Sequence, residues 1–188
     1  MPVISVTLIQ GYSDETRQML CQRLTDAAMA TIQAPAEAVT VFVNEVQPPS
    51  YMRGRTAKTP GSAPRPPADI SLEFLEAQGA RELDRARSLC SPDFEMIFPG
   101  PVRFTEFQEL IDWAAPRYQS VAKRIERVEE APMGDYVGVW VTGTLYGARP
   151  DGTPFEDIRF VDRFQVVGDK ITRQEVWNDL AESLSSSA

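Results

Sequence analysis

The chain has 188 residues, of which 43% are hydrophobic and 24% charged, a balance typical of folded globular proteins. Its formal net charge of −8 argues against binding to nucleic acid, whose phosphates require clustered lysine and arginine. It contains no histidine, which excludes Ser–His and Cys–His nucleophilic pairs and the commonest metal ligand. Acid–base chemistry near neutral pH must therefore use a carboxylate with a shifted pKa, a tyrosine, a lysine or the α-amino group.

The two cysteines and the apolar stretches set the expected environment. Cys21 and Cys90 are too few for a disulfide framework and too far apart in sequence to suggest a zinc site, so we expect no metal and no cofactor. No apolar stretch is long enough to span a membrane, and no basic-then-apolar leader opens the chain. We therefore expect a cytoplasmic protein whose partners include neither membrane nor nucleic acid.

The N-terminal region predicts a strand, a helix and a second strand. Residues 3–9 alternate apolar and polar side chains, as a half-buried strand does. Ser13 is a good N-cap for a helix over residues 14–32, where apolar residues recur at helical spacing. Residues 39–46 alternate again. This strand–helix–strand order implies a right-handed crossover and a parallel strand pair.

Residues 1–56 form too small a unit to stand alone. Two strands and one helix cannot bury enough apolar area, so this unit must pack against copies of itself or the rest of the chain. Residues 47–67 carry six prolines and two glycines, typical of a loop or spacer, and we assign residues 57–68 as a linker. Packing against copies is then favoured, which predicts a homo-oligomer.

Residues 69–182 predict a second α+β unit. A helix over residues 70–89, with Asp69 as its cap, is followed by a short strand at 94–98 and a helix opened by Thr105. Four strands are then expected, at residues 120–129, 136–146, 156–167 and 170–177. Helices followed by an antiparallel meander are an α+β pattern, and residues 183–188 are expected to be a frayed tail.

The N-terminal unit resembles the 4-oxalocrotonate tautomerase family. The resemblance rests on Pro2 followed by a strand, the Gly11-Tyr-Ser-Asp-Glu15 turn, the Ala34-Pro35 break and the second strand at matching spacing. It covers about residues 2–55 and implies assembly of dimers into a hexamer. It also implies that loss of Met1 exposes the amine of Pro2, a general base whose unperturbed pKa is roughly 8.

The resemblance also implies roles for further residues, and the sequence departs from the family at two positions. Tyr12 and Thr40 stand where the family's two substrate-binding arginines would lie, whereas Tyr51 matches its active-site aromatic. Tyr12 and Tyr51 are candidate hydrogen-bond donors to a developing enolate, and Arg53 or Arg55 a candidate anchor for a substrate carboxylate. A solvated basic loop is an equally simple interpretation of these two arginines.

The second unit, ending in the segment Phe160 to Ile171, resembles SnoaL-like domains of the NTF2-like group. The resemblance implies a cone-shaped fold with an apolar pocket. Along the predicted strand, Asp162 shares a face with Ile158, Phe160 and Phe164, while Arg159 and Arg163 point the other way. A carboxylate on an apolar face is either an acid–base group with a raised pKa or a paired structural residue.

These observations predict a cofactor-free tautomerase that acts on a small carbonyl acid through Pro2. One alternative is a SnoaL-like isomerase or cyclase that acts through Asp162, with the first unit serving assembly. The other is a non-catalytic oligomeric protein that binds a small ligand.

Overall fold

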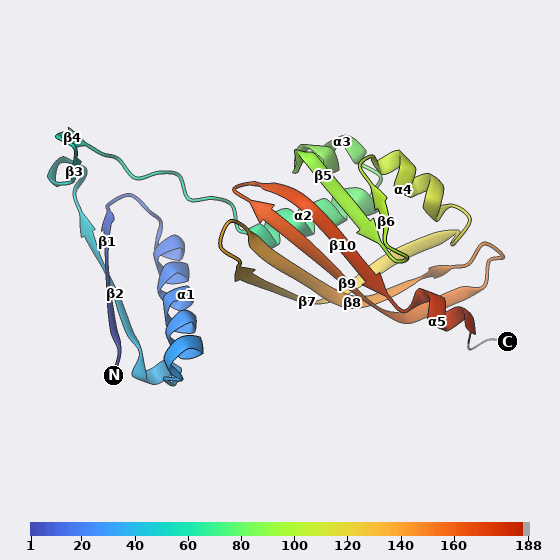
Figure 1. Cartoon of the computed structure of the whole chain (residues 1–188), viewed down its shortest axis with the longest axis horizontal. Coiled ribbons are helices and arrows are strands. Elements are labelled where there is room, and N and C mark those ends of the chain that lie inside the picture. The colour runs from blue at the N-terminus through green and yellow to red at the C-terminus, as the bar shows by residue number, and fades with distance from the viewer. Residues whose placement is uncertain (186–188) are drawn as a thin grey trace. The chain divides into compact units, whose positions relative to one another are not determined.

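The computed structural model describes residues 1–185 and divides the chain into two compact units, one of Met1–Ala63 and one that starts at Pro64 (Figure 1). Both units mix helices with strands, which confirms the predicted α+β class. The boundary between the units falls inside the predicted linker, residues 57–68. Among the described residues, no helix is long and apolar enough to cross a membrane.

The first unit consists of one helix on a two-stranded parallel sheet. Strand β1 (Val3–Ile9) and helix α1 (Asp14–Ile32) have the predicted bounds, and β2 (Thr40–Val46) begins one residue later than expected. The Ser13 hydroxyl caps α1, because its oxygen accepts the backbone N–H of Thr16 at 3.2 Å. The short 3-10 helix η1 (Ala36–Ala38) leads from α1 into β2.

A hairpin lies where the sequence indicated only a loop. After the 3-10 helix η2 (Pro48–Ser50), β3 (Met52–Arg53) pairs with β4 (Thr56–Ala57). Gly54 and Arg55, between the two strands, have φ angles of 57° and 64°. A two-residue hairpin turn of type I′ has positive φ at both positions, as these two residues do. Glycine adopts such angles readily but arginine rarely does, so the sequence carried only half of the turn signal.

The first unit has no buried side chain of its own. Every residue from Met1 to Ala63 is at least partly exposed. Val3, Ile32 and Phe42 are 61%, 58% and 45% exposed, although all three are strong hydrophobes. The expectation that this unit cannot bury a core by itself agrees with these values.

The second unit is built on a six-stranded sheet with the order β6-β5-β10-β9-β8-β7. Strand β10 pairs in parallel with β5, and the other neighbours are antiparallel. The strands are β5 (Cys90–Phe98), β6 (Val102–Phe104), β7 (Ser120–Pro132), β8 (Val137–Ala148), β9 (Pro154–Val167) and β10 (Lys170–Asn178). The four-stranded meander is confirmed, whereas β6 was not predicted, because three residues beside Pro99, Gly100 and Pro101 carry no strand periodicity.

The helices differ from the predicted ones at their ends. The single helix expected over residues 70–89 is wrong: α2 (Pro67–Gly79) and α3 (Leu83–Ser88) are separate, and Arg81 between them has a φ of 62°. Asp69 is not the N-cap of α2 but lies in its first turn, behind the N-terminal proline. Helix α4 (Phe107–Ala114) begins with a capping box between Glu106 and Glu109.

The C-terminal segment holds one more helix than expected. Helix α5 (Leu180–Ser185) overlaps the predicted tail at residues 183–188, and residues 186–188 lie outside the described part of the chain. Leu180, at the start of α5, packs against the core of the second unit.

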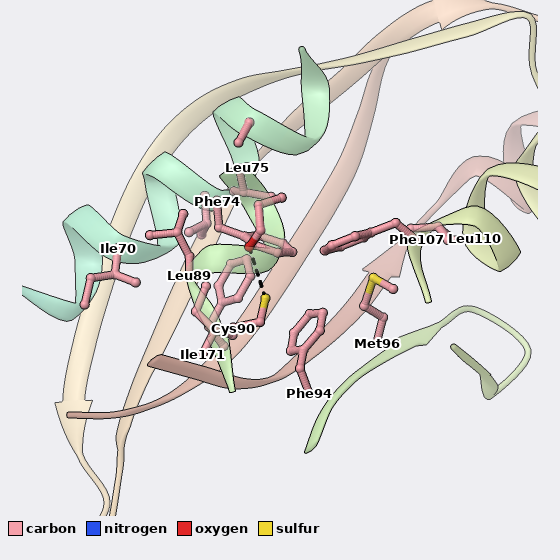
Figure 2. Packing of buried hydrophobic residues seen from close by; sticks show 14 of the residues in the cluster. Ile70, Phe74, Leu75, Leu89, Cys90, Phe94, Met96, Phe107, Leu110 and Ile171 are labelled. Carbon is pink, nitrogen blue, oxygen red and sulfur yellow. Dashed lines mark hydrogen bonds between the residues drawn. The ribbon is translucent and has the colours of Figure 1, made fainter. Parts of the chain in front are cut away.

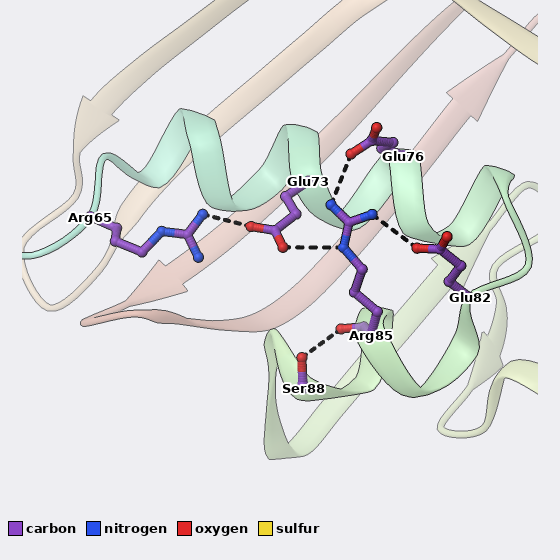
Figure 3. A network of polar contacts seen from close by, with 6 residues as sticks. All are labelled: Arg65, Glu73, Glu76, Glu82, Arg85 and Ser88. Carbon is purple, nitrogen blue, oxygen red and sulfur yellow. Dashed lines mark hydrogen bonds and ion pairs between the residues drawn. The ribbon is translucent and has the colours of Figure 1, made fainter.

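A network of ion pairs joins α2 and α3 (Figure 3). The Arg85 guanidinium lies 2.9 Å from Glu76, 2.9 Å from Glu82 and 3.3 Å from Glu73. Glu73 also binds Arg65 at 2.6 Å, so the chain just before α2 is held to the helix. These groups are partly exposed and each pair contributes little, but together they orient two helices that only residues 80–82 separate.

The core lies between the sheet and α2, α3 and α4 (Figure 2). Phe74 of α2 is fully buried at its centre. Its ring centroid lies 5.5 Å from that of Phe94, 5.7 Å from that of Phe164 and 5.9 Å from that of Phe107. One helix is thereby fastened to strands β5 and β9 and to helix α4 by aromatic contacts.

We expect Phe74→Ala to lower the free energy of unfolding of the second unit by about 3–5 kcal/mol, because truncation leaves a cavity among three rings. Urea denaturation followed by tryptophan fluorescence measures this unit alone, since Trp113, Trp140 and Trp177 all lie within it. Val167→Ala, at an exposed position, is the control and should change stability by less than about 0.5 kcal/mol. Equal midpoints for the two variants would contradict this account of the core.

Candidate functional site

Pro2 lies at the end of the first unit where β1 and β2 begin. The parallel register pairs Val3 with Thr40, and the Thr40 N–H donates to the Pro2 carbonyl oxygen at 3.0 Å. Pro2 is half-buried, and Met1 before it is almost fully exposed. The backbone of Pro2 is thus fixed by the sheet, while the residue that must be removed to free its nitrogen is accessible.

Tyr12, Tyr51, Arg53 and Arg55 lie at the opposite end. Tyr12 follows β1, and Tyr51 follows β2 through η2. An Arg53 Nη donates to the Tyr51 hydroxyl at 3.5 Å, so these two side chains are brought together, and Arg55 lies in the adjacent hairpin turn. The seven-residue strand β1, roughly 20 Å long, separates this group from Pro2. A single chain therefore does not bring Pro2 to the other predicted residues.

Two contacts hold this second group in place. A side chain at Gly11, whose φ is 133°, would place its Cβ 2.7 Å from Cγ of Pro60, so the linker packs directly on the turn before Tyr12. The Lys58 N–H donates to the Tyr51 carbonyl oxygen at 3.2 Å. The chain after the hairpin therefore joins the turn that carries Tyr12 to the segment that carries Tyr51.

Arg17 is a residue that the sequence analysis missed. Its guanidinium binds Glu45 of β2 at 2.6 Å, contacts Asp14, and donates to the Tyr12 carbonyl oxygen at 3.3 Å. It thus ties the turn that carries Tyr12 to the end of β2. A shallow hollow surrounds it, lined by Asp14, Arg17, Gln18, Cys21, Gln22, Val43 and Glu45.

In the second unit, Asp162 of β9 is 0% exposed and faces the core, as the alternation predicted. The Lys123 ammonium, from β7, donates to its Oδ2 and lies 4.9 Å from the centroid of the Phe160 ring. Burial raises the pKa of Asp162, and the nearby Lys123 charge opposes that shift. The site therefore holds a costly buried carboxylate with a single cationic partner.

Gln174 of β10 is also 0% exposed and lies on the other side of Asp162 from Lys123. Its amide helps to lower the pKa of Asp162, yet no direct hydrogen bond of acceptable geometry joins the two side chains. Within the described residues, Oδ1 of Asp162 and both amide atoms of Gln174 lack a hydrogen-bond partner. Each such buried group costs about 1–3 kcal/mol, so this row of polar groups is not explained by stability.

The opposite face of the sheet is paired. Arg159 binds Asp179 at 2.6 Å, and Arg163 binds Glu175 and donates to the Tyr136 hydroxyl at 2.8 Å. Both arginines point away from Asp162, which confirms that prediction. Across residues 1–185, no group of three or more acidic or cysteine side chains is arranged to hold a metal ion.

Lys123 and Gln174 could have been suspected from the sequence only weakly. Lys123 has apolar residues two positions before and after it, Val121 and Ile125, which places a cation on an apolar face of a strand. The predicted meander places one strand between β7 and β9, but nothing in the sequence gives the register that brings Lys123 to Asp162.

Comparison with known proteins gives separate matches for the two units. The profile of the tautomerase enzyme family matches residues 2–59. A probable tautomerase of Ralstonia nicotianae is 42% identical over 69 residues, which are 37% of this chain and 96% of that protein. A probable tautomerase of Halalkalibacterium halodurans is 37% identical over 51 residues, 27% of this chain and 84% of that protein.

The second unit matches the SnoaL-like domain profile over residues 72–174. TerC, crystallised with polyporic acid, has a TM-score of 0.53 at 20% identity and covers 62% of this chain and 94% of its own. An NTF2-like protein of Burkholderia thailandensis has a TM-score of 0.53 at 16% identity, with 66% and 98% covered. At these identities the likeness shows the fold alone.

The matches confirm both resemblances inferred from sequence and support a function of the tautomerase or isomerase type. They arise from different parts of the chain, and each agrees with the fold of the unit that it covers. The chain belongs to the tautomerase family through its first unit and to the SnoaL-like domain family through its second.

Proposed function

We propose that the first unit is a cofactor-independent tautomerase in which the Pro2 amine moves a proton between the enol and keto forms of a small carbonyl acid. Family membership supports the reaction class. The observation that carries the proposal is the exposed Met1 before a Pro2 whose backbone is fixed by Thr40. Once Met1 is removed, the proline nitrogen is a secondary amine on a rigid ring.

In the proposed reaction, the neutral amine accepts the proton of the enol hydroxyl. The resulting ammonium then donates a proton to the carbon of the double bond, and the oxygen becomes a carbonyl. The amine ends neutral, so no oxidant, reductant or cofactor is required. Tyr12 and Tyr51 would donate hydrogen bonds to the oxygen as it bears charge, and Arg53 or Arg55 would bind the carboxylate.

This site would need more than one copy of the chain. Pro2 lies about the length of β1 from Tyr12, Tyr51 and Arg53, so a second copy must supply one of the two groups. The first unit has no buried residue and leaves Val3 and Phe42 exposed on its sheet, which favours association between copies. We therefore propose a homo-oligomer, built from dimers up to a hexamer, with sites between copies.

A second candidate function belongs to the second unit, with Asp162 as the acid–base group of an isomerase or cyclase. The observation that favours it is a fully buried carboxylate with one unpartnered oxygen. Asp162 would take a proton from the carbon beside a carbonyl group. The C–H electrons would form a C=C bond as the carbonyl π electrons move to oxygen, and the proton would return at another atom as the carbonyl re-forms.

We expect Pro2→Ala to lower turnover of phenylenolpyruvate by about 10²–10⁴-fold, because the variant amine is neither cyclic nor placed in the same way. The ultraviolet absorbance of the enol measures the rate, after intact mass has shown loss of Met1 from both proteins. Asp162→Asn, in the other unit, is the matched control and should retain the rate. Retained Met1 in an active protein would exclude the prolyl base, and no turnover by any of these proteins would favour the non-catalytic binding alternative.

Mixing two inactive variants tests whether the site is shared. We expect Pro2→Ala and Tyr51→Phe proteins, unfolded together and refolded at equal amounts, to recover activity, because about a quarter of the sites then combine an intact Pro2 with an intact Tyr51 from another copy. Each variant refolded alone is the control. If the mixture is no more active than the average of its components, the two residues act from one chain.

Substitution of Lys123 and substitution of Asp162 should change the stability of the second unit in opposite directions. Because burial raises the folded-state pKa of Asp162 above its ordinary value of 3.8, the folded protein holds the extra proton, and stability falls as pH rises from 3.8 through the folded-state pKa. Lys123→Met should therefore cost about 3 kcal/mol at neutral pH and much less near pH 3. Asp162→Asn should match or exceed the parent at neutral pH.

Urea denaturation followed by tryptophan fluorescence at the two pH values measures these differences. Lys170→Met is the control, because the Lys170 ammonium donates to the carbonyl oxygen of Ser88, at 2.7 Å, on the surface of the same unit. A loss for Lys123→Met that does not change with pH would show that the carboxylate is not the group left unpaired.

A further inference from the structure

Lys123 connects the exterior of the second unit to its buried carboxylate. Its side chain is 24% exposed, whereas Asp162, to which it is paired, is 0% exposed. An ammonium group has three N–H donors, and Asp162 is the acceptor that the structure gives it. Donors of Lys123 are therefore left for a ligand that approaches from the exposed side.

The surface beside Lys123 is apolar. Val121 and Ile125 flank it on the same face of β7, and they are 38% and 40% exposed. The ring of Phe160 lies beneath the ammonium, at 4.9 Å. A cation set among exposed aliphatic side chains favours a ligand with an anionic end and an apolar body.

Behind Lys123, the row of polar groups continues across the sheet from β7 to β10. Oδ1 of Asp162 can accept a hydrogen bond, and the Gln174 amide can both donate and accept, but none of these atoms has a partner among the described residues. A ligand oxygen in the form of a hydroxyl or carbonyl group would satisfy them. A ligand that pairs with Asp162 and Gln174 therefore needs a second oxygen-containing group besides its anionic end.

We propose that the second unit binds an apolar carboxylic acid that carries a keto or hydroxy group, and that Lys123 anchors the carboxylate in competition with Asp162. The inference rests on the second candidate site and concerns binding rather than proton transfer. The chemical class is that of the carbonyl acid proposed for the first unit, so a compound released by one unit meets the requirement of the other.

Because the ligand carboxylate and Asp162 compete for Lys123, substitutions of Lys123 and of Asp162 should change the affinity for the ligand in opposite directions. Lys123→Met removes the anchor and should weaken binding of a carboxylate by about tenfold or more, since a charge-assisted hydrogen bond is lost. Lys123→Arg keeps the charge and should retain binding. Asp162→Asn removes the competing anion and should tighten binding by about tenfold.

The chain is well suited to a direct test, because it contains three lysines in three settings. Lys58 follows the hairpin of the first unit, Lys170 lies on the surface of the second, and Lys123 lies at the proposed site. Incorporation of lysine labelled with ¹³C at Cε leaves the ammonium groups unmodified and gives each lysine a separate NMR signal, assigned by single Lys→Arg variants. The full-length Pro2→Ala protein is used, so that the first unit does not convert the probe.

The probes are phenylpyruvate and phenylacetone, which has the same ring and ketone but no carboxylate. We expect phenylpyruvate to shift the Lys123 signal saturably, to leave Lys170 unchanged, and to bind at least about tenfold more tightly than phenylacetone. A shift confined to Lys58, or equal affinity for the two probes, would overturn the proposal. So would an Asp162→Asn protein that binds phenylpyruvate more weakly than the parent.

These outcomes separate the inference from the second candidate function. If the Asp162→Asn protein binds phenylpyruvate more tightly but loses turnover of a bound acid, both the Lys123 anchor and the acid–base role of Asp162 hold. If it binds more tightly and no turnover depends on Asp162, the acid–base function fails while the anchor at Lys123 stands. An unchanged Lys170 signal in each variant shows that the second unit remains folded.

Discussion

The constraint on which the first unit depends is that two strands and one helix cannot enclose a core. Not one residue of Met1–Ala63 is buried, and strong hydrophobes such as Val3 and Phe42 remain in contact with solvent. The same geometry places Pro2 and Tyr51 at opposite ends of β1. The missing core and the separation of the proposed site residues thus have one cause, and the proposed association between copies would resolve both. The second unit, by contrast, buries an aromatic core within one chain.

In that second unit, the polar side chains of Asp162 and Gln174 lie within a largely apolar core, and Lys123 is paired with Asp162. A fully buried carboxylate and an amide without partners lower stability, and an apolar replacement of similar volume would cost less. Such groups are retained where chemistry or recognition requires them. The ion pairs on the opposite face differ in kind, because Arg159 and Arg163 are matched by acidic neighbours and reach solvent.

The linker contacts the first unit near its N-terminal end and the second unit near its C-terminal end. Pro60 packs on Gly11 of the first unit, and Arg65 binds Glu73 of the second at 2.6 Å. Four residues, Gly61 to Pro64, separate these two anchors. Only these four residues of the predicted linker, residues 57–68, lie between the anchors, and Pro60 before them packs on the turn that leads to Tyr12.

The elements with a local periodicity can be predicted from the amino-acid sequence alone. Strand β1, helix α1 and the meander from β7 to β10 follow from alternation and caps, and the burial of Asp162 follows from its place between Phe160 and Phe164. Features that depend on long-range pairing or on unusual dihedral angles are visible only in the folded chain. The break between α2 and α3 at Arg81 and the pairing of β5 with β10 are examples. The predicted meander places β8 between β7 and β9, but bulges in both strand pairings shift the register, and this register lets Lys123 reach Asp162 across β8.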